Sequence, residues 1–486
     1  MSSYRFDNCK IVFSGVLENI TPLIIGCGDD SETDSDVLKN YDGNPYIGGS
    51  SFAGILRHHF ENYYKNYFNI DKYFGYSVND EGNGSKILFS DIMLKNEAKI
   101  QIRDGIKVNK RGIAEDRAKF DYEVIEPNAK FAFKIEISSA DNDKDEMLKI
   151  IATLKRDIEE ERIKIGAKTN LGFGKIKFIE DNLSLYDLRN KTDIIKWLKK
   201  ENNKYTGAQL LPIEFTNNDF KIDFYFIIKD SLIIKHYSTD PQAPDAEHFK
   251  SGGKHIIPGT SLKGVIRARG EKILNTLNIA DKERLATYLF GGNSQFIKNS
   301  GNDNGVADNN DSVKDVSKVK NSINNGNKSS TGSIPSRLQV SEVAIEQNAA
   351  SAIQQRIKID RFTNATVNSA LFDSMPLFSI DEKELNMLRL TIKKPIDSEI
   401  GLILLIIKDL WTEDLSVGGE KNIGRGVLKG KRAVINYKDL NIILPEDVSQ
   451  LAEEDKVKLQ LYVNKLLDNK ENADYFNKMD NIYNTI

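Results

Sequence analysis

The sequence is poor in cysteine and histidine and carries almost no excess of charge. Its 486 residues include two cysteines and five histidines, and 68 Lys and Arg stand against 71 Asp and Glu, a formal net charge of −3. Two cysteines cannot form a disulfide framework or a cysteine-based zinc site. A balanced chain also has no global basic field, so any nucleic-acid site must be a local basic surface.

Long hydrophobic runs are missing as well. No stretch reaches the ~18 consecutive apolar residues that cross a bilayer, and the longest, 401–407, predicts a buried strand or helix segment. The first residues contain no apolar run preceded by basic residues. We therefore expect no signal peptide, no membrane partner and a reduced, cytoplasmic protein. The length favours two or three domains.

The chain repeats itself. Phe290-Gly291 lies 216 positions after Phe74-Gly75, and Ser341 lies 251 positions after Ser90. Four longer matches accompany them in the same order: NPYIGGSSFAGILR (44–57) with KHIIPGTSLKGVIR (254–267), ILFSDIML (87–94) with LQVSEVAI (338–345), IKVNK (106–110) with IKIDR (357–361), and GAKTNLGFGKIK (166–177) with GGEKNIGRGVLK (418–429). Such ordered self-similarity predicts a duplicated domain.

The spacing between matched residues rises from 216 at the Phe-Gly pair to 251 at Ser90 and Ser341. This increase indicates an insertion in the second copy, at about 297–335. This segment is rich in Asn, Gly, Ser and Lys, and we expect it to be disordered. It is either a tolerated surface insertion or a binding loop that becomes ordered on contact. The predicted organisation is a first domain at 1–183, a helical linker at 184–215, a second domain at 216–440 and a C-terminal helical tail at 441–486.

Each copy has the same predicted order of elements. A β-rich run is followed by a helix, further strands, a second helix (145–161 in the first copy) and a last strand. This order predicts an α+β protein with two tandem ferredoxin-like units. Many readers of single-stranded RNA share that topology, and are called RRM-like.

The first repeated motif places glycines and hydroxyls at the start of a helix. Such a helix start favours binding of a phosphate, although a Gly-Ser turn that caps a helix is more often structural. The candidate residues are Ser50, Ser51 and Arg57 in the first copy, and Thr260, Ser261, Lys263 and Arg267 in the second.

Two further repeated segments are basic. Glycine-rich loops let backbone approach a ligand, and alternating basic and apolar residues are typical of a β-hairpin arm with one solvated face. Both fit contacts with a phosphate backbone, and a solvated hairpin is the alternative. The loops contain Lys168, Gly172, Gly174, Lys421, Gly424 and Arg425, and the arms contain Arg103, Lys107, Lys110, Arg111, Arg356, Lys358 and Arg361.

An acidic loop precedes the first motif in both copies. The first copy has Asp34 and Asp36, and the second has Asp240 and Asp245; the pattern Asp34-Ser-Asp36 matches Asp245-Ala-Glu247. Carboxylates in such loops can hold Mg²⁺ or act as a base on a ribose hydroxyl. Acidic surface loops without any such role are also common.

Together these motifs resemble the RAMP superfamily, the backbone subunits of type III CRISPR–Cas effector complexes. The resemblance covers nearly the whole chain, twice, and so implies a fused pair of subunits. It further implies an RRM-like palm with a hairpin thumb (about 103–120 and 355–370), and stacking along a CRISPR RNA. The implied partners are CRISPR RNA, complementary target RNA, other RAMP-type subunits and the large signalling subunit of a type III complex.

The resemblance also implies a reaction. In the family an aspartate before the Gly-Ser-Ser motif cuts target RNA near each thumb, requires Mg²⁺ or another divalent metal, and uses the neighbouring 2′-hydroxyl as nucleophile. By position this role falls to Asp34 and Asp245, which are also the possible metal ligands, with Asp36 and Asp240 as competitors. The basic, hydroxyl and glycine residues named above would contact RNA.

The chain departs from the family pattern at two positions. Gly48 stands where the family has proline, and Ala53 stands where it has the lysine that Lys263 keeps. The second acidic loop lacks the usual residues after its aspartate, so one of the two sites can be inactive. Two alternatives to cleavage are therefore open: a non-catalytic RNA-binding scaffold of the same complex, and a ribonuclease that processes guide RNA.

Overall fold

The computed structural model describes residues 8–26, 33–78, 81–108, 114–140, 143–207, 210–215, 218–237, 242–293, 333–468 and 472–476. The predicted disordered insertion lies outside these residues except at its last positions. The chain forms two compact units. Unit 1 comprises Met1–Asn217, His248–Gly259 and Ser341–Ile345, and unit 2 comprises Asn218–Glu247, Thr260–Val340 and Glu346–Ile486.

Unit 1 is built on an antiparallel sheet. Strand β1 (Cys9–Asn19) lies between β10 (Ile176–Asp187) and β9 (Lys130–Ser139), and β9 also pairs with β5 (Ile87–Phe89) and β6 (Ile92–Leu94). Buried and half-buried residues alternate along β9, as expected for a strand with one face in a core.

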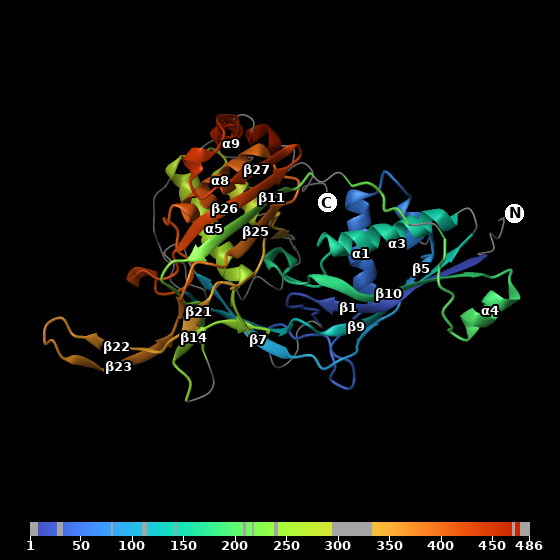
Figure 1. Cartoon of the computed structure of the whole chain (residues 1–486), viewed down its shortest axis with the longest axis horizontal. Helices are drawn as coiled ribbons and strands as arrows, with labels where there is room; N and C mark the ends of the chain where they lie inside the picture. Colours follow the sequence, from blue (N-terminus) through green and yellow to red (C-terminus); the bar gives the residue numbers. More distant parts are fainter. Residues whose placement is uncertain are drawn as a thin grey trace, which may run out of the picture. The chain divides into compact units, whose positions relative to one another are not determined.

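Two helices cover this sheet. Helices α1 (Gly49–Tyr63) and α3 (Lys144–Glu159) lie on the same side of it (Figure 1). Their buried apolar side chains, including Phe52, Phe60 and Leu154, join those of the sheet in one core. Burial of this apolar surface is the main force that holds the layers together.

The remaining elements of unit 1 are short or stand apart from the sheet. Strands β7 (Ile100–Val108) and β8 (Ala114–Ile125) pair with each other as a hairpin, and Ile125 of β8 also bridges to Leu23. The others are β2 (Tyr46–Ile47), α2 (Ile70–Phe74), β3 (Tyr76–Val78), β4 (Glu81–Asn83), the 3₁₀ turn η2 (Thr169–Leu171), α4 (Lys191–Leu198), β15 (Lys250–Ser251), β16 (Lys254–Ile257) and β20 (Val343–Ala344).

Unit 2 contains an equivalent sheet. Its order is β19 (Leu338–Val340), β25 (Asn386–Ile392), β11 (Phe220–Ile228), β26 (Leu428–Tyr437) and β27 (Leu440–Leu444), all antiparallel. Helix α8 (Asp397–Trp411) packs on β26 and on α9 (Glu453–Leu466). The apolar run 401–407 lies inside α8 and is largely buried.

Unit 2 also has several smaller elements. Helix α5 begins at its first-motif glycine (Gly259–Thr276), and β22 (Gln354–Ile359) with β23 (Thr366–Met375) forms the hairpin of the second copy. The rest are α6 (Lys282–Phe290), β12 (Ser231–Leu232), β13 (Lys235–His236), β14 (Ala246–His248), β17 (Gly292–Asn293), β18 (Ser333–Ile334), β21 (Ala349–Ser351), β24 (Leu377–Ser379), η4 (Lys421–Ile423) and η5 (Val448–Gln450).

Local details repeat between the units. The central strand of each sheet has a register shift against the last strand, at Val16/Leu17 and at Tyr225/Phe226. The helices α2 and α6 both end in a glycine with positive φ, Gly75 and Gly291, a conformation that favours glycine. In the described part of the chain, no helix is long and apolar enough to cross a membrane.

The division into units differs from the sequence boundaries. The predicted linker at 184–215 clusters with unit 1, and the predicted tail at 441–486 clusters with unit 2. Segments 248–259 and 341–345 belong to the second sequence copy but cluster with unit 1. Within unit 1 they form a small sheet, in which Ile256 and Ile257 of β16 pair with Ala344 and Val343 of β20. The first unit is thus completed by chain from the second copy.

Candidate nucleic-acid interface and acid pairs

Each unit carries a hairpin arm. Figure 1 shows β22 and β23 as a long arm that extends away from the sheet of its own unit. On this arm Lys358 and Arg361 are exposed and have no carboxylate partner among the described residues. Phe362, in the turn at its end, is 96% exposed. An exposed aromatic ring between cations is suited to contact bases and phosphates.

The acidic loop of the first copy is joined to the base of its hairpin by a reciprocal pair of hydrogen bonds. The backbone N–H of Asp34 donates to Oδ1 of Asp121 (3.1 Å), and the backbone N–H of Asp121 donates to Oδ2 of Asp34 (3.0 Å). The next backbone contact follows two residues on, where the N–H of Glu123 donates to the carbonyl of Ser35 (3.0 Å). Asp34 remains exposed.

The second copy repeats this geometry. The backbone N–H of Asp245 donates to Oδ1 of Asp373 (2.8 Å), and the backbone N–H of Asp373 donates to Oδ2 of Asp245 (3.0 Å). The loop then runs parallel to β23 through Ala246 and Glu247. Asp245 is exposed and Asp373 is half-buried, as Asp34 and Asp121 are.

The competing aspartates differ in their surroundings. Asp36 is 8% exposed, and its Oδ1 accepts a hydrogen bond from the Thr33 hydroxyl (2.5 Å). Asp240 lies outside the described residues. Among the described acids of the two loops, Asp34 and Asp245 are therefore the equivalent pair that faces solvent.

The partner acids Asp121 and Asp373 were missed by the sequence reasoning, although a signal was present. Each follows a phenylalanine, and Phe372-Asp373 lies 252 positions after Phe120-Asp121, the offset that relates Gly174 to Gly426. Both phenylalanines are 41% exposed. The duplication therefore contains a second repeated acidic motif, Phe-Asp, in the two hairpins.

The first-motif hydroxyls differ in accessibility between the copies. Ser50 and Ser51 are exposed at the start of α1, whereas Thr260 and Ser261 are half-buried at the start of α5. The N–H of Gly49 already donates to Oδ1 of Asp91 (2.7 Å), so a carboxylate occupies part of the anion-binding end of α1.

The motif arginines hold the turn after the second helix of each unit, and their predicted contacts with RNA stay predictions. Arg57 donates to the carbonyl of Gly75 and pairs with Glu61, and Arg267 donates to the carbonyl of Gly291 (3.1 Å) and pairs with Glu271 (2.8 Å). Because the same carbonyl and the same (i, i+4) acid are used in both copies, the motif arginine is explained by packing within each unit.

Lys263 is likewise engaged inside its unit. Its ammonium donates to the Ser336 hydroxyl (2.6 Å) and to the carbonyl of Leu338 (3.2 Å). Burial lowers the pKa of Lys263 to about 8, and the neighbouring Arg267 contributes to the shift. The predicted contact of Lys263 with RNA is therefore replaced by a structural link between α5 and β19.

Arg103 is the clearest correction. It is 3% exposed, and its guanidinium donates to Glu342 (2.7 Å) and to Ser251 (2.8 Å) within unit 1. Glu126 lies 3.5 Å away and the ring of Phe173 stacks on it at 5.0 Å. A buried, paired guanidinium cannot contact a nucleic acid, so this prediction was wrong.

The glycines of the loops at 166–177 and 418–429 have a structural role. Gly172, Gly174, Gly424 and Gly426 all have positive φ. A Cβ on Gly174 would lie 2.0 Å from the carbonyl oxygen of Ile165. Each loop folds back on its own unit, so the glycines are required whether or not RNA binds.

The cations of the two glycine loops differ in their exposure to solvent and in their partners. Arg425 is 3% exposed and pairs with Glu420, which also pairs with Arg356, so neither arginine is free to bind RNA as predicted. Lys168 lies over the ring of Tyr122, and burial lowers its pKa to about 8, with a contribution from Arg103. Lys421 is exposed.

Part of the hairpin of unit 1 lies outside the described residues. Lys110 and Arg111 lie outside the described residues, and Lys107 is described only as part of β7. Their predicted RNA contacts therefore stay predictions.

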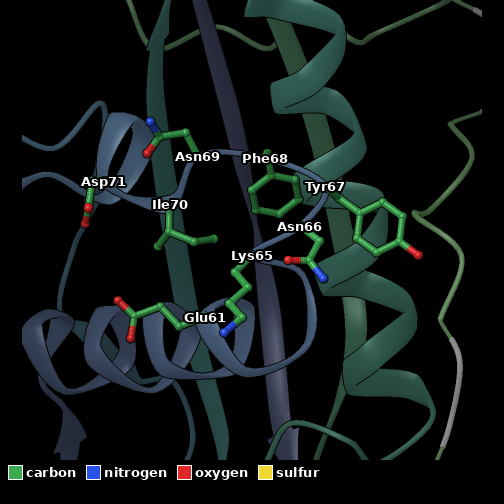
Figure 2. Close-up of a pocket in the computed structure, with 8 residues that line it drawn as sticks. All are labelled: Glu61, Lys65, Asn66, Tyr67, Phe68, Asn69, Ile70 and Asp71. Carbon is green, nitrogen blue, oxygen red and sulfur yellow. The ribbon is translucent and has the colours of Figure 1, made fainter.

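A pocket of about 560 Å³ lies at the C-terminal end of α1 (Figure 2). It is lined by Glu61, Lys65, Asn66, Tyr67, Phe68, Asn69, Ile70 and Asp71. Two of its acids, Glu61 and Asp71, are ion-paired with Arg57. None of the acid-pair residues lines this pocket.

Comparison with protein families finds one family whose model matches most of the chain. The model of the RAMP superfamily matches two regions, residues 16–177 and 188–429. A comparison with curated proteins finds no match.

Proposed function

The chain belongs to the RAMP superfamily and is thus a CRISPR-associated RNA-binding subunit, and on this premise we propose a specific activity for it. It is a double backbone subunit of a type III CRISPR RNA-guided complex. It binds CRISPR RNA and cuts complementary target RNA at two sites, through Asp34 in unit 1 and Asp245 in unit 2.

The observation that carries the proposal is the repeated acid pair. In each unit an exposed aspartate, preceding the Gly-Ser-Ser motif, is bound through its backbone and one carboxylate oxygen to the base of the hairpin arm. The reciprocal bonds recur in both units around an aspartate that stays exposed, and this supports a shared role for the two loops.

The sheet order supports the proposed ferredoxin-like class. In sequence order, the strands β1, β5, β9 and β10 take the positions β10-β1-β9-β5 in the sheet, with α1 and α3 as the two connecting helices. The equivalent order in unit 2 is β26-β11-β25-β19. Both match the split βαβ arrangement that single-strand RNA readers use.

The proposed reaction is a transesterification. The free carboxylate oxygen of Asp34 or Asp245 takes the proton of a ribose 2′-hydroxyl as general base. The 2′-oxygen then forms a bond to the adjacent phosphorus, and the bond from phosphorus to the 5′-oxygen breaks. A water molecule protonates the leaving 5′-oxygen, so the products carry a 2′,3′-cyclic phosphate and a 5′-hydroxyl.

A divalent metal fits this surface without a full protein cage. No group of three or more potential ligands occurs among the described residues. Mg²⁺ usually binds one or two carboxylates together with water and substrate phosphates, so in each acid pair one carboxylate could hold the metal while the other acts as base. When bound there, the metal would neutralise charge on the reacting phosphate.

The proposed RNA contacts rest first on residues that are exposed. These are Ser50 and Ser51 at the start of α1, and Lys358, Arg361 and Lys421 in unit 2. Each phosphate contact contributes to a salt-dependent affinity. Arg361→Ala should therefore weaken binding and lower the slope of affinity against salt.

The test reconstitutes the subunit with CRISPR RNA and its partner subunits, and adds labelled target RNA in Mg²⁺ or EDTA. The wild type should cut in Mg²⁺ alone, and Asp34→Ala with Asp245→Ala together should abolish cutting while target binding is kept. Asp42→Ala, an exposed aspartate in the same connection, is the matched control and should cut normally.

Two results would decide against the proposal. Binding of target without cutting by the wild type would identify a scaffold. Cutting of the CRISPR precursor without a target would identify a guide-processing ribonuclease.

A further inference from the structure

We propose that Asp121 and Asp373 are positioning residues for cleavage: each holds the reacting aspartate of its own unit in place through the reciprocal hydrogen bonds. This inference rests on the proposed function, because it concerns how Asp34 and Asp245 are presented to RNA. It assigns a role to two acids outside the motifs that suggested the reaction.

The geometry fixes both the backbone and the side chain of the reacting residue. Oδ1 of Asp121 accepts the N–H of Asp34, which anchors the backbone at that position. The N–H of Asp121 in turn holds Oδ2 of Asp34, which sets the rotamer of the side chain. Hydrogen bonds between backbone N–H groups and carboxylates are stronger than hydrogen bonds between neutral groups. The two bonds together therefore restrain both the backbone and the side chain of the reacting aspartate.

The same bonds use only one of the two carboxylate oxygens of each reacting aspartate. Oδ2 of Asp34 and Oδ2 of Asp245 are used by the hairpin, and their Oδ1 atoms have no hydrogen-bond partner in the described part of the chain. Since both residues are exposed, one oxygen of each is held toward solvent in a fixed orientation. A general base requires such a fixed, accessible oxygen.

The two units differ in the other contacts that hold the acidic loop against the hairpin. In unit 1 the carboxylate of Glu123 also holds the loop, by accepting the N–H of Val37 (3.0 Å) and pairing with Lys39 (3.0 Å). In unit 2 the residue equivalent to Glu123 is Met375, which cannot do this. The acid pair is a side-chain feature that both units keep, and in unit 2 the loop is held in addition by the pairing of β14 with β23.

The activity test compares Asp→Ala with Asp→Asn at each position. Asp121→Ala should slow the cut that Asp34→Ala removes by about 10- to 100-fold in single-turnover assays, and leave the other cut unchanged as an internal control. Asp121→Asn keeps an oxygen that can accept the Asp34 N–H, and should restore that cut to within about threefold of wild type. Asp373→Ala should likewise slow the second cut and leave the first unchanged.

A second measurement needs no RNA and no activity. Hydrogen–deuterium exchange of the full chain should show faster exchange in the peptide that contains Asp34 after Asp121→Ala, and wild-type exchange after Asp121→Asn. Equal exchange in wild type, Asp121→Ala and Asp121→Asn would overturn the proposal that Asp121 holds Asp34 in place.

The outcomes separate this inference from the proposed function. If Asp34→Ala removes no cut, the proposed function fails. If Asp34→Ala removes a cut but Asp121→Ala leaves it at the wild-type rate, only the positioning role is wrong. If Asp121→Asn is as slow as Asp121→Ala, the charge of Asp121 is what matters, and positioning by hydrogen bonding is again wrong.

Discussion

Replacing Arg103 should destabilise unit 1 without removing an RNA contact. The guanidinium is buried between Glu342 and Glu126, both of them less than a tenth exposed. Arg103→Met keeps most of the volume but leaves two buried carboxylates without their cation. Breaking a buried pair in this way costs about 3–5 kcal/mol in the free energy of unfolding. For a unit of this size that corresponds to roughly 6–20 °C in the midpoint of thermal unfolding.

The loss should depend on pH. Burial raises the pKa of the Glu342 carboxyl, and Arg103 opposes that shift. A carboxyl with a raised pKa favours the folded state at pH values below its unfolded pKa, and this contribution is lost as the pH rises through the folded pKa. Removing Arg103 raises the pKa further, so the variant should be most destabilised at pH 8 and less so at pH 5.

Calorimetry of wild type, Arg103→Met and Arg103→Met/Glu342→Gln checks this. The double variant should recover part of the lost stability, because it removes one uncompensated charge. Arg361→Met is the matched control, since this arginine is exposed and unpaired among the described residues; its stability should stay within about 0.5 kcal/mol of wild type. A normal unfolding midpoint in Arg103→Met, combined with weaker RNA binding and a smaller salt slope, would refute the structural role.

Three further predictions concern residues that the sequence had linked to RNA. Arg267→Ala should lower stability by about 1 kcal/mol through the lost bond to the Gly291 carbonyl, whereas RNA affinity of the folded protein should not change in a filter-binding assay. Gly172→Ala should lower the unfolding midpoint more than Gly424→Ala in thermal melts: both positions need positive φ, but a Cβ on Gly172 would lie 2.4 Å from the backbone nitrogen of Glu342 and one on Gly424 meets open space. Lys263 has a lowered pKa of about 8, so its charge opposes folding; the stability of wild type relative to Lys263→Met should rise between about pH 8 and pH 10.5 in denaturant titrations, and a flat difference would count against a buried ammonium.

The duplication and the mixed α/β class could be predicted because short sequence patterns determine them. The glycine that starts each first-motif helix, the Phe-Gly pair and the glycine loops recur at nearly constant spacing, and the structure places them at equivalent points. The resemblance to the RAMP superfamily is confirmed by the family model. The type III assignment and the cleavage reaction stay proposals.

Side-chain roles that depend on distant partners could not be predicted. Arg103 looked like a solvated hairpin cation, but it is buried by Ser251 and Glu342, which lie more than a hundred residues away in sequence. Arg57 and Arg267 looked like phosphate ligands because the sequence does not show that they face the carbonyls of the repeated Phe-Gly pairs. Asp121 was overlooked because its partner, Asp34, is 87 residues away and on another element.

The central claim is that the two acid pairs are two independent cutting sites. The most direct measurement maps the cuts in one end-labelled target RNA with wild type, Asp34→Ala and Asp245→Ala in the assembled complex. We expect two metal-dependent cuts in the wild type, with each variant losing one different cut and keeping the other. Two cuts that persist in both variants, or that vanish together in either one, would contradict the claim.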